Sequence, residues 1–103
     1  MHLPLGNTIA KLANGITDTP VLMAAKSTLR NSHNVVIGIA TNDALSTNAA
    51  NIGKLLNYKN IFFVPFRQDN PITKPNSLVF SYVHLIDTIC YALDNQQIQP
   101  LLL

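Results

Sequence analysis

Residues 35–43 read Val-Val-Ile-Gly-Ile-Ala-Thr-Asn-Asp, and this stretch decides the fold class. The run from Val35 to Ala40 is continuously apolar and rich in β-branched residues, which is typical of a strand buried on both faces of a parallel sheet. Three polar residues, Thr41, Asn42 and Asp43, follow at once. Open α/β sheets bind ligands beyond the carboxyl ends of their strands. The stretch therefore predicts an α/β fold and also the position of a binding loop.

A second apolar run, Ile-Phe-Phe-Val-Pro at 61–65, predicts another buried strand. The segment from about Leu45 to Asn57 between the two runs predicts a helix. A strand, a helix and a further strand in this order indicate parallel strands joined by a right-handed crossover. Because two strands make a poor sheet alone, we expect this chain to form the second half of a doubly wound fold.

Helices are expected on both sides of this pair of strands. Residues 6–18 predict a short helix that begins with Asn7 or Thr8 as its N-cap and ends at Gly15. Its apolar face repeats at i, i+3, i+4 and i+7: Ile9, Leu12, Ala13 and Ile16.

Two further helices are expected along the chain. One is capped by Thr17 or Asp18 and continues to about Arg30. The other follows a polar loop at 66–76 and runs from Ser77 to about Leu93. Its apolar face is predicted from helical spacing: Leu78, Tyr82, Leu85, Ile89 and Leu93. The three leucines at the end of the chain are expected to dock on the core or on a partner.

Composition limits the class of protein. Apolar residues make up 48% of the 103 residues and charged residues 12%, about half of the usual ~25%. We therefore expect much of the surface to be covered by a missing half or by neighbouring subunits. The formal charge of +2 comes from scattered basic residues, so nucleic acid is not an expected partner. No apolar stretch reaches the ~18 residues of a membrane span, and the chain is expected to be cytoplasmic.

The segment around residues 6–18 resembles a known family. Its Asn7-Thr8 turn is followed by Ala10-Lys11, then by Ala13, Gly15 and Asp18. This pattern resembles the turn and helix of the flavoprotein family of homo-oligomeric, flavin-containing cysteine decarboxylases. Four further segments are similar to one branch of that family: residues 21–26, 41–45, 74–77 and 97–100.

The resemblance implies a Rossmann-like three-layer flavoprotein fold, of which residues 1–103 form a single partial domain. We expect this domain to correspond to the C-terminal half, without the N-terminal half that carries the phosphate loop. The family implies flavin mononucleotide (FMN) as cofactor. Because the Gly/Ser loop that holds the flavin phosphate has no counterpart here, we expect the chain alone to bind FMN weakly or not at all. Tight, stoichiometric binding in a flavin fluorescence titration would refute this expectation.

The branch that the chain resembles implies a role in a two-subunit oxidoreductase of spore-forming bacteria. That enzyme oxidises a dihydro-type precursor to pyridine-2,6-dicarboxylate during sporulation. The implied partner is an A-type subunit that resembles an NAD(P)-dependent dehydrogenase, and the implied compartment is the mother-cell cytoplasm. A homo-oligomer is also implied. A noncatalytic assembly module, or the remnant of a flavoprotein, is the alternative.

Asn7, Thr8 and Lys11 are the candidate cofactor-binding residues. The resemblance implies that Asn7 and Thr8 contact the flavin and substrate, and that Lys11 lies near the flavin or its phosphate. The alternative is that the first two cap the helix and that Lys11 is a surface charge.

Thr41, Asn42 and Arg67 are the candidate substrate-binding residues. The resemblance implies that Asn42 keeps the amide of a loop that contacts substrate, while Thr41 replaces a methionine of that loop. Arg67 could clamp a carboxylate through two parallel hydrogen bonds. The alternatives are a helix cap by Asn42 or Asp43 and a solvated Arg67. No catalytic base can be assigned.

A metal site is not predicted. The histidines lack metal-ligand spacing with one another or with Cys90, which we expect to be a small core residue. They are His2, His33 and His84.

Overall fold

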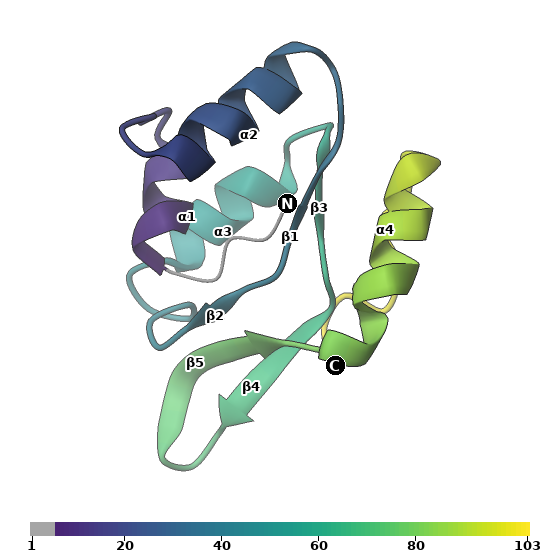
Figure 1. Cartoon of the computed structure of the whole chain (residues 1–103). Helices are drawn as coiled ribbons and strands as arrows, with labels where there is room; N and C mark the ends of the chain where they lie inside the picture. The colour runs from purple at the N-terminus through teal and green to yellow at the C-terminus, as the bar shows by residue number, and fades with distance from the viewer. Residues whose placement is uncertain (1–5) are drawn as a thin grey trace.

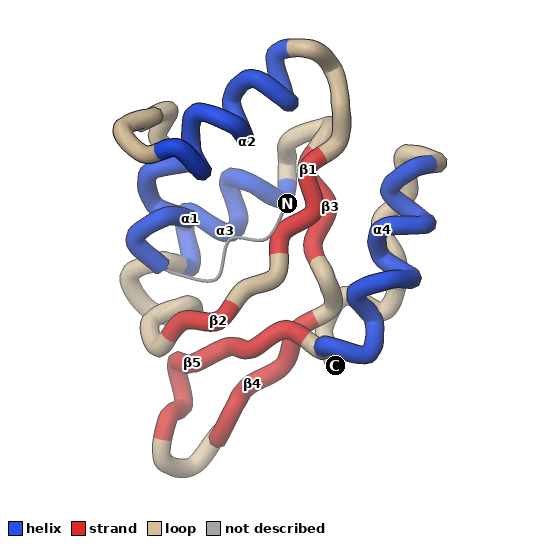
Figure 2. The backbone as a smooth tube through the Cα atoms, in the orientation of Figure 1, coloured by secondary structure: helices blue, strands red, loops and turns tan. Residues whose placement is uncertain are grey.

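The computed structural model describes residues 6–103, so His2 lies outside the described part of the chain. The helices and strands follow in the order α1 (Gly6–Ala13), α2 (Pro20–Arg30), β1 (Val35–Ile37), β2 (Ala40–Thr41), α3 (Ala49–Leu56), β3 (Ile61–Phe63), β4 (Phe66–Asn70), β5 (Lys74–Phe80), the 3-10 helix η1 (Tyr82–His84) and α4 (Leu85–Leu93). Figure 1 colours the chain in this order, and Figure 2 shows the same backbone with helices in blue and strands in red.

Strands β1 and β3 pair in parallel between layers of helices. Val35 lies opposite Ile61 and Ile37 lies opposite Phe63. The helices α1, α2 and α3 lie on one side of this pair and α4 lies on the other (Figure 1). The predicted order of strand, helix and parallel strand is therefore confirmed, and so is a short parallel sheet flanked by helices.

Each strand of the pair contributes to two hydrophobic cores, because successive side chains point to opposite faces. Val35, Ile37 and Phe63 join the larger core with residues of the three N-terminal helices. Val36 and Phe62 join a smaller core with Ala92 of α4. This burial on both faces explains why both strands are continuously apolar.

The predicted strand at 35–40 is shorter than expected. It ends at Ile37, and Ala40 and Thr41 form β2 in a second sheet, where they pair antiparallel with Val79 and Leu78 of β5. The chain thus leaves the parallel sheet after Ile37, and the polar loop that begins at Thr41 lies at the end of a strand of the other sheet.

The prediction of a loop at 66–76 and a helix from Ser77 was wrong. Residues 66–80 form the antiparallel hairpin of β4 and β5, and α4 begins only at Leu85. The apolar spacing of this segment fits a helix, but β2 and β4 flank Leu78 and Val79 and supply hydrogen-bonding partners on both sides. Periodicity in one sequence does not show such partners.

Helix α1 ends as predicted. Gly15 has a φ of +73°, which is a left-handed conformation that glycine adopts without a steric penalty. The Ile16 amide donates to the Lys11 carbonyl at 2.9 Å, and the Gly15 amide donates to that of Leu12 at 3.3 Å. These are the two hydrogen bonds of a Schellman motif. The helix begins at Gly6, so Asn7 and Thr8 lie in its first turn instead of capping it.

Helix α2 is capped one residue later than predicted. The Thr19 hydroxyl accepts a hydrogen bond from the Leu22 amide at 3.2 Å, and Pro20 is the first helical residue. Thr17 and Asp18 do not cap the helix, and Asp18 pairs with Lys11 instead. The predicted end at Arg30 is confirmed.

Helix α3 is shorter than predicted. It runs from Ala49 to Leu56 because the residues that precede it, up to Asn48, form turns.

Helix α4 buries a different face from the one predicted. Thr88 and Ala92 are buried, whereas Tyr82 and Leu93 are 77% and 78% exposed. Cys90 is exposed as well, so its prediction as a core residue was wrong.

Of the three leucines that were expected to dock, Leu101 does so, whereas Leu102 and Leu103 are 69% and 49% exposed. Leu101 packs against the larger core, and its carbonyl accepts a hydrogen bond from the Phe66 amide at 3.0 Å. Among residues 6–103, no helix is both long and apolar enough to pass through a membrane.

Candidate functional site

The polar loop after β1 opens onto a hollow of about 320 Å³. Thr41 and Asn42 line it together with Asp69 and Ser77 from the β4–β5 hairpin. The Ser77 hydroxyl donates to Oδ1 of Asn42 at 3.5 Å. This contact engages only the side-chain oxygen of Asn42, and the residue is exposed. Its amide nitrogen can therefore donate to a small ligand that enters the hollow.

Asp43 fixes the conformation of this loop. Its Oδ1 accepts hydrogen bonds from the Thr41 hydroxyl at 2.6 Å and from the Asn48 amide at 2.9 Å. Its Oδ2 accepts from the Thr47 hydroxyl at 3.4 Å. The carboxylate therefore joins the residue before Asn42 to the start of α3. The predicted alternative that Asn42 or Asp43 acts only as a simple helix cap does not describe this arrangement.

The same hydrogen bonds hold the pKa of Asp43 below its ordinary value of 3.8. The Thr41 hydroxyl has the largest effect and the Asn48 amide the next, while partial burial acts in the opposite direction. Donors that bond the carboxylate stabilise its charged form. The group is therefore ionised at neutral pH.

Replacing Asp43 by alanine is expected to lower the free energy of unfolding by about 1–2 kcal/mol, because the buried Asn48 amide loses its acceptor. Since folding lowers the pKa of Asp43, its stabilisation is fully present above the ordinary value of 3.8. It disappears as the pH falls through the lower pKa of the folded state. Urea titrations at pH 7 and pH 3 measure both effects. Asp94→Ala, at an exposed position, is the matched control. An equal loss at both pH values would contradict the assigned role.

Asn7 lines a second hollow, of about 350 Å³, together with Asp43. Asn48 and Asn51 line it as well. The Asn51 side-chain amide donates to Oδ1 of Asn48 at 2.9 Å, and that of Asn14, in the turn after α1, donates to Oδ1 of Asn51 at 3.3 Å. Asn7 and Asn42 thus line two different hollows, and Asp43 lines the one beside Asn7.

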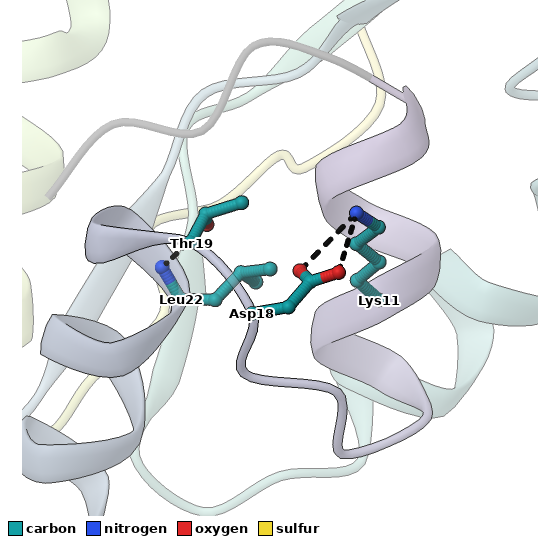
Figure 3. Close-up of polar contacts among 4 residues, drawn as sticks. All are labelled: Lys11, Asp18, Thr19 and Leu22. Carbon is teal, nitrogen blue, oxygen red and sulfur yellow. Dashed lines mark hydrogen bonds and ion pairs between the residues drawn. The ribbon is translucent and has the colours of Figure 1, made fainter.

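Lys11 is engaged within the chain. Its Nζ lies 3.1 Å and 3.0 Å from the two carboxylate oxygens of Asp18 (Figure 3). This ion pair joins α1 to the segment that precedes the Thr19 cap of α2. The alternative was a surface charge on the helix, and the role of Lys11 toward a cofactor stays a prediction. Thr8 is half-buried in the first turn of α1.

Arg67 lies on the same sheet face as the hollow beside Asn42, but does not line it. Arg67 pairs with Val79, which pairs in turn with Ala40, and paired residues of adjacent strands point to the same face. Ala40 and Val79 line the hollow. Arg67 itself lines a separate hollow of about 240 Å³ near the end of the chain.

Sequence reasoning missed the contributions of the hairpin and of α3. Asp69 and Ser77 were assigned to a loop and to a helix start, so their place beside Asn42 could not be inferred. Asn48 and Asn51 are three residues apart at a helix start. This spacing alone could have indicated that their side chains are neighbours. Within residues 6–103, no group of three or more His, Cys, Asp or Glu side chains could hold a metal ion.

The layers and the position of the loop define the class of fold. A parallel pair of strands lies between helices, and the chain runs from the carboxyl end of β1 through β2 to the polar loop. This is the Rossmann-like arrangement of flavoproteins that the sequence predicts, and a solved structure confirms it. The structure matches that of the dipicolinate synthase B subunit from Bacillus halodurans C with a TM-score of 0.95 and 56% identity. The match covers 97% of this chain and 52% of that one.

The sequence is similar to the same protein from a second species. It is 57% identical to the dipicolinate synthase B subunit of Bacillus subtilis (strain 168) over 97 residues. These residues make up 94% of this chain and 48% of the relative, so the chain spans about half of the relative's length. No family model matches the chain. The resemblance to the B subunit of dipicolinate synthase is thus confirmed, and that it falls on the C-terminal half stays a prediction.

Proposed function

We propose that this chain acts as part of a dipicolinate synthase B subunit and contributes to the oxidation of a dihydrodipicolinate-type precursor to pyridine-2,6-dicarboxylate. The observation that carries the proposal is the 57% identity over 94% of the chain. The loop with Thr41 and Asn42 lies within the matched fold and beside an open hollow. Sporulation is the process that this activity is proposed to serve.

The proposed role of the loop is to bind and orient the substrate. The exposed amide of Asn42 can donate a hydrogen bond to a carboxylate of the ring, and the Thr41 hydroxyl is held in place by Asp43. Asp69 lies in the same hollow, and its negative charge repels a carboxylate. We propose that the substrate's carboxylate therefore lies on the Asn42 side of the hollow.

Aromatisation of the precursor removes a hydride and a proton, and a flavin or nicotinamide ring supplies the hydride acceptor. The candidate residues around Asn7 and Lys11 do not suit an FMN phosphate. Lys11 is already paired with Asp18, and the hollow beside Asn7 contains the carboxylate of Asp43. We propose that the flavin phosphate is held by residues outside this chain, and that NAD(P) belongs to an A-type dehydrogenase partner.

A chimera tests the proposal in Bacillus subtilis. The matched half of that organism's B subunit is replaced by this chain, and dipicolinate is measured by chromatography in sporulating cells. The chimera is expected to restore dipicolinate to a strain that lacks its own B subunit. Asn42→Ala in the chimera is expected to lower the yield by about 10- to 100-fold, because a positioned hydrogen-bond donor to the reacting substrate is lost.

The control for this experiment is Asn57→Ala. Asn57 is also exposed, but its side-chain amide donates to the Gly53 carbonyl of α3, the helix that it follows. A chimera that gives no dipicolinate while being present at normal abundance would contradict the proposal. Equal yields from Asn42→Ala and Asn57→Ala would contradict the role of Asn42.

The exposed apolar residues of η1 and α4 favour a second candidate, a noncatalytic assembly module. Tyr82, Val83, Ile86 and Leu93 are each at least 68% exposed. For such a module, Ile86→Ser would abolish dipicolinate formation in the chimera by preventing assembly, whereas Asn42→Ala would leave it unchanged. Size-exclusion chromatography of the Ile86→Ser chimera reports on assembly directly.

A further inference from the structure

A groove between the C-terminal end of α1 and α2 has a volume of about 330 Å³ and shares no lining residue with the hollows beside Asn42 and Asn7. Its apolar wall includes Leu12, Ile16, Leu29 and Tyr58. Ile16 is 46% exposed and Tyr58 is 40% exposed. A volume above about 300 Å³ with a largely apolar lining is typical of a small-molecule site.

Two basic side chains also line this groove. Lys26 and Arg30 lie four residues apart on α2, so they occupy the same helix face, and both line the groove. They also line an adjacent hollow of about 230 Å³. Within residues 6–103 the ion pairs are Lys11–Asp18 and Lys74–Asp69, so neither cation of the groove has an acidic partner there.

The last carbonyl groups of α2 do not need Lys26 and Arg30 as hydrogen-bond donors. Its last carbonyl groups already accept backbone hydrogen bonds: the Ser32 amide donates to Leu29 at 3.0 Å, and the His33 amide donates to Thr28 at 3.0 Å. Basic residues near a helix C-terminus interact favourably with the helix dipole. That effect, however, does not require an apolar groove beside them or a half-exposed tyrosine in its wall.

We propose that this groove binds a small aromatic carboxylate. The ring lies in the apolar part, against Tyr58 and Leu29, and the carboxylate meets Lys26 and Arg30. An arginine guanidinium can bind both oxygens of a carboxylate at once, and aromatic rings favour stacked or edge-on contacts with one another. The charge of the groove and the apolar wall together select this ligand class over neutral rings and over acids without a ring.

An NMR titration of the full chain with benzoate tests the site. Saturable shifts are expected for the amides of Gly15, Ile16, Thr17 and Arg30, with a dissociation constant of about 1 mM or lower. Acetate, which lacks the ring, and benzyl alcohol, which lacks the charge, are expected to bind at least about tenfold more weakly. The amides of Thr41 and Asn42 are expected not to move, which separates this site from the proposed substrate loop.

Three variants complete the test. The double variant Lys26→Gln/Arg30→Gln is expected to bind benzoate at least about tenfold more weakly, and so is Tyr58→Ala, which keeps both cations. The control Lys54→Gln/Lys74→Gln loses the same charge elsewhere and is expected to bind like the unaltered chain.

Four outcomes would overturn the proposal. They are the absence of saturable shifts at about 20 mM benzoate, shifts centred on Asn42, equal binding of acetate, or unchanged binding by Lys26→Gln/Arg30→Gln.

Discussion

Replacement of Phe63 by alanine is expected to lower the free energy of unfolding by about 3–5 kcal/mol, the usual loss for a large core aromatic. Phe63 is fully buried in β3 and belongs to the larger core. Its ring packs edge-on against that of Phe66, with centroids 6.2 Å apart and an angle of 68° between the planes. The cavity left by the substitution lies where β3, the hairpin and the N-terminal helices meet. Urea denaturation followed by circular dichroism measures the loss.

Tyr82→Ala is the control for this prediction. It also removes an aromatic ring, but Tyr82 is 77% exposed, and a change at such a position is expected to stay within about 0.5 kcal/mol. A loss below about 1 kcal/mol for Phe63→Ala would mean that the junction is not a tightly packed core.

The parallel core could be predicted because its strands carry an unambiguous signal. Residues such as Val36 and Phe62 are apolar although their neighbours already fill one face, and only burial on both faces explains such a run. The end of α1 at Gly15 was also predictable, because its positive φ is a requirement that few other residues meet. In both places local chemistry and tertiary structure agree.

The hairpin could not be predicted because its strands depend on distant partners. The segment from Ser77 to Phe80 has apolar spacing that fits a helix or a strand, and only pairing with β2 and β4 decides between them. The buried face of α4 was missed for a related reason. The small residues Thr88 and Ala92 of α4 are buried. Of the larger residues of the predicted face, Tyr82, Ile89 and Leu93 are exposed.

Prediction of the candidate site was limited in the same way. The sequence placed Asn42 directly after a buried parallel strand, but in the structure it follows the half-buried β2 of the antiparallel sheet. The sequence could not show that Asp69 and Ser77 share its hollow, since they arrive on the unpredicted hairpin. Nor could it show that Asp18 neutralises Lys11, because this pair forms only when the chain turns back after Gly15.

Replacing Gln97 by alanine is expected to lower the free energy of unfolding by about 2–4 kcal/mol, because two backbone groups of a fully buried residue lose their partners. The Phe63 amide donates to Oε1 of Gln97 at 2.8 Å, and Nε2 of Gln97 donates to the Phe63 carbonyl at 2.7 Å. The Gln97 side chain thus satisfies the edge of β3 that faces away from β1, much as a further strand would.

Hydrogen exchange distinguishes this role from a general loss of packing. In Gln97→Ala the Phe63 amide is expected to exchange faster than the amide of Val64, which still donates to the Ile37 carbonyl at 2.9 Å. The neighbouring variant Gln96→Ala removes an exposed side chain and is expected to leave both amides unchanged. Equal acceleration of the two amides in Gln97→Ala would indicate global destabilisation, and the role of Gln97 as the partner of the β3 edge would then be wrong.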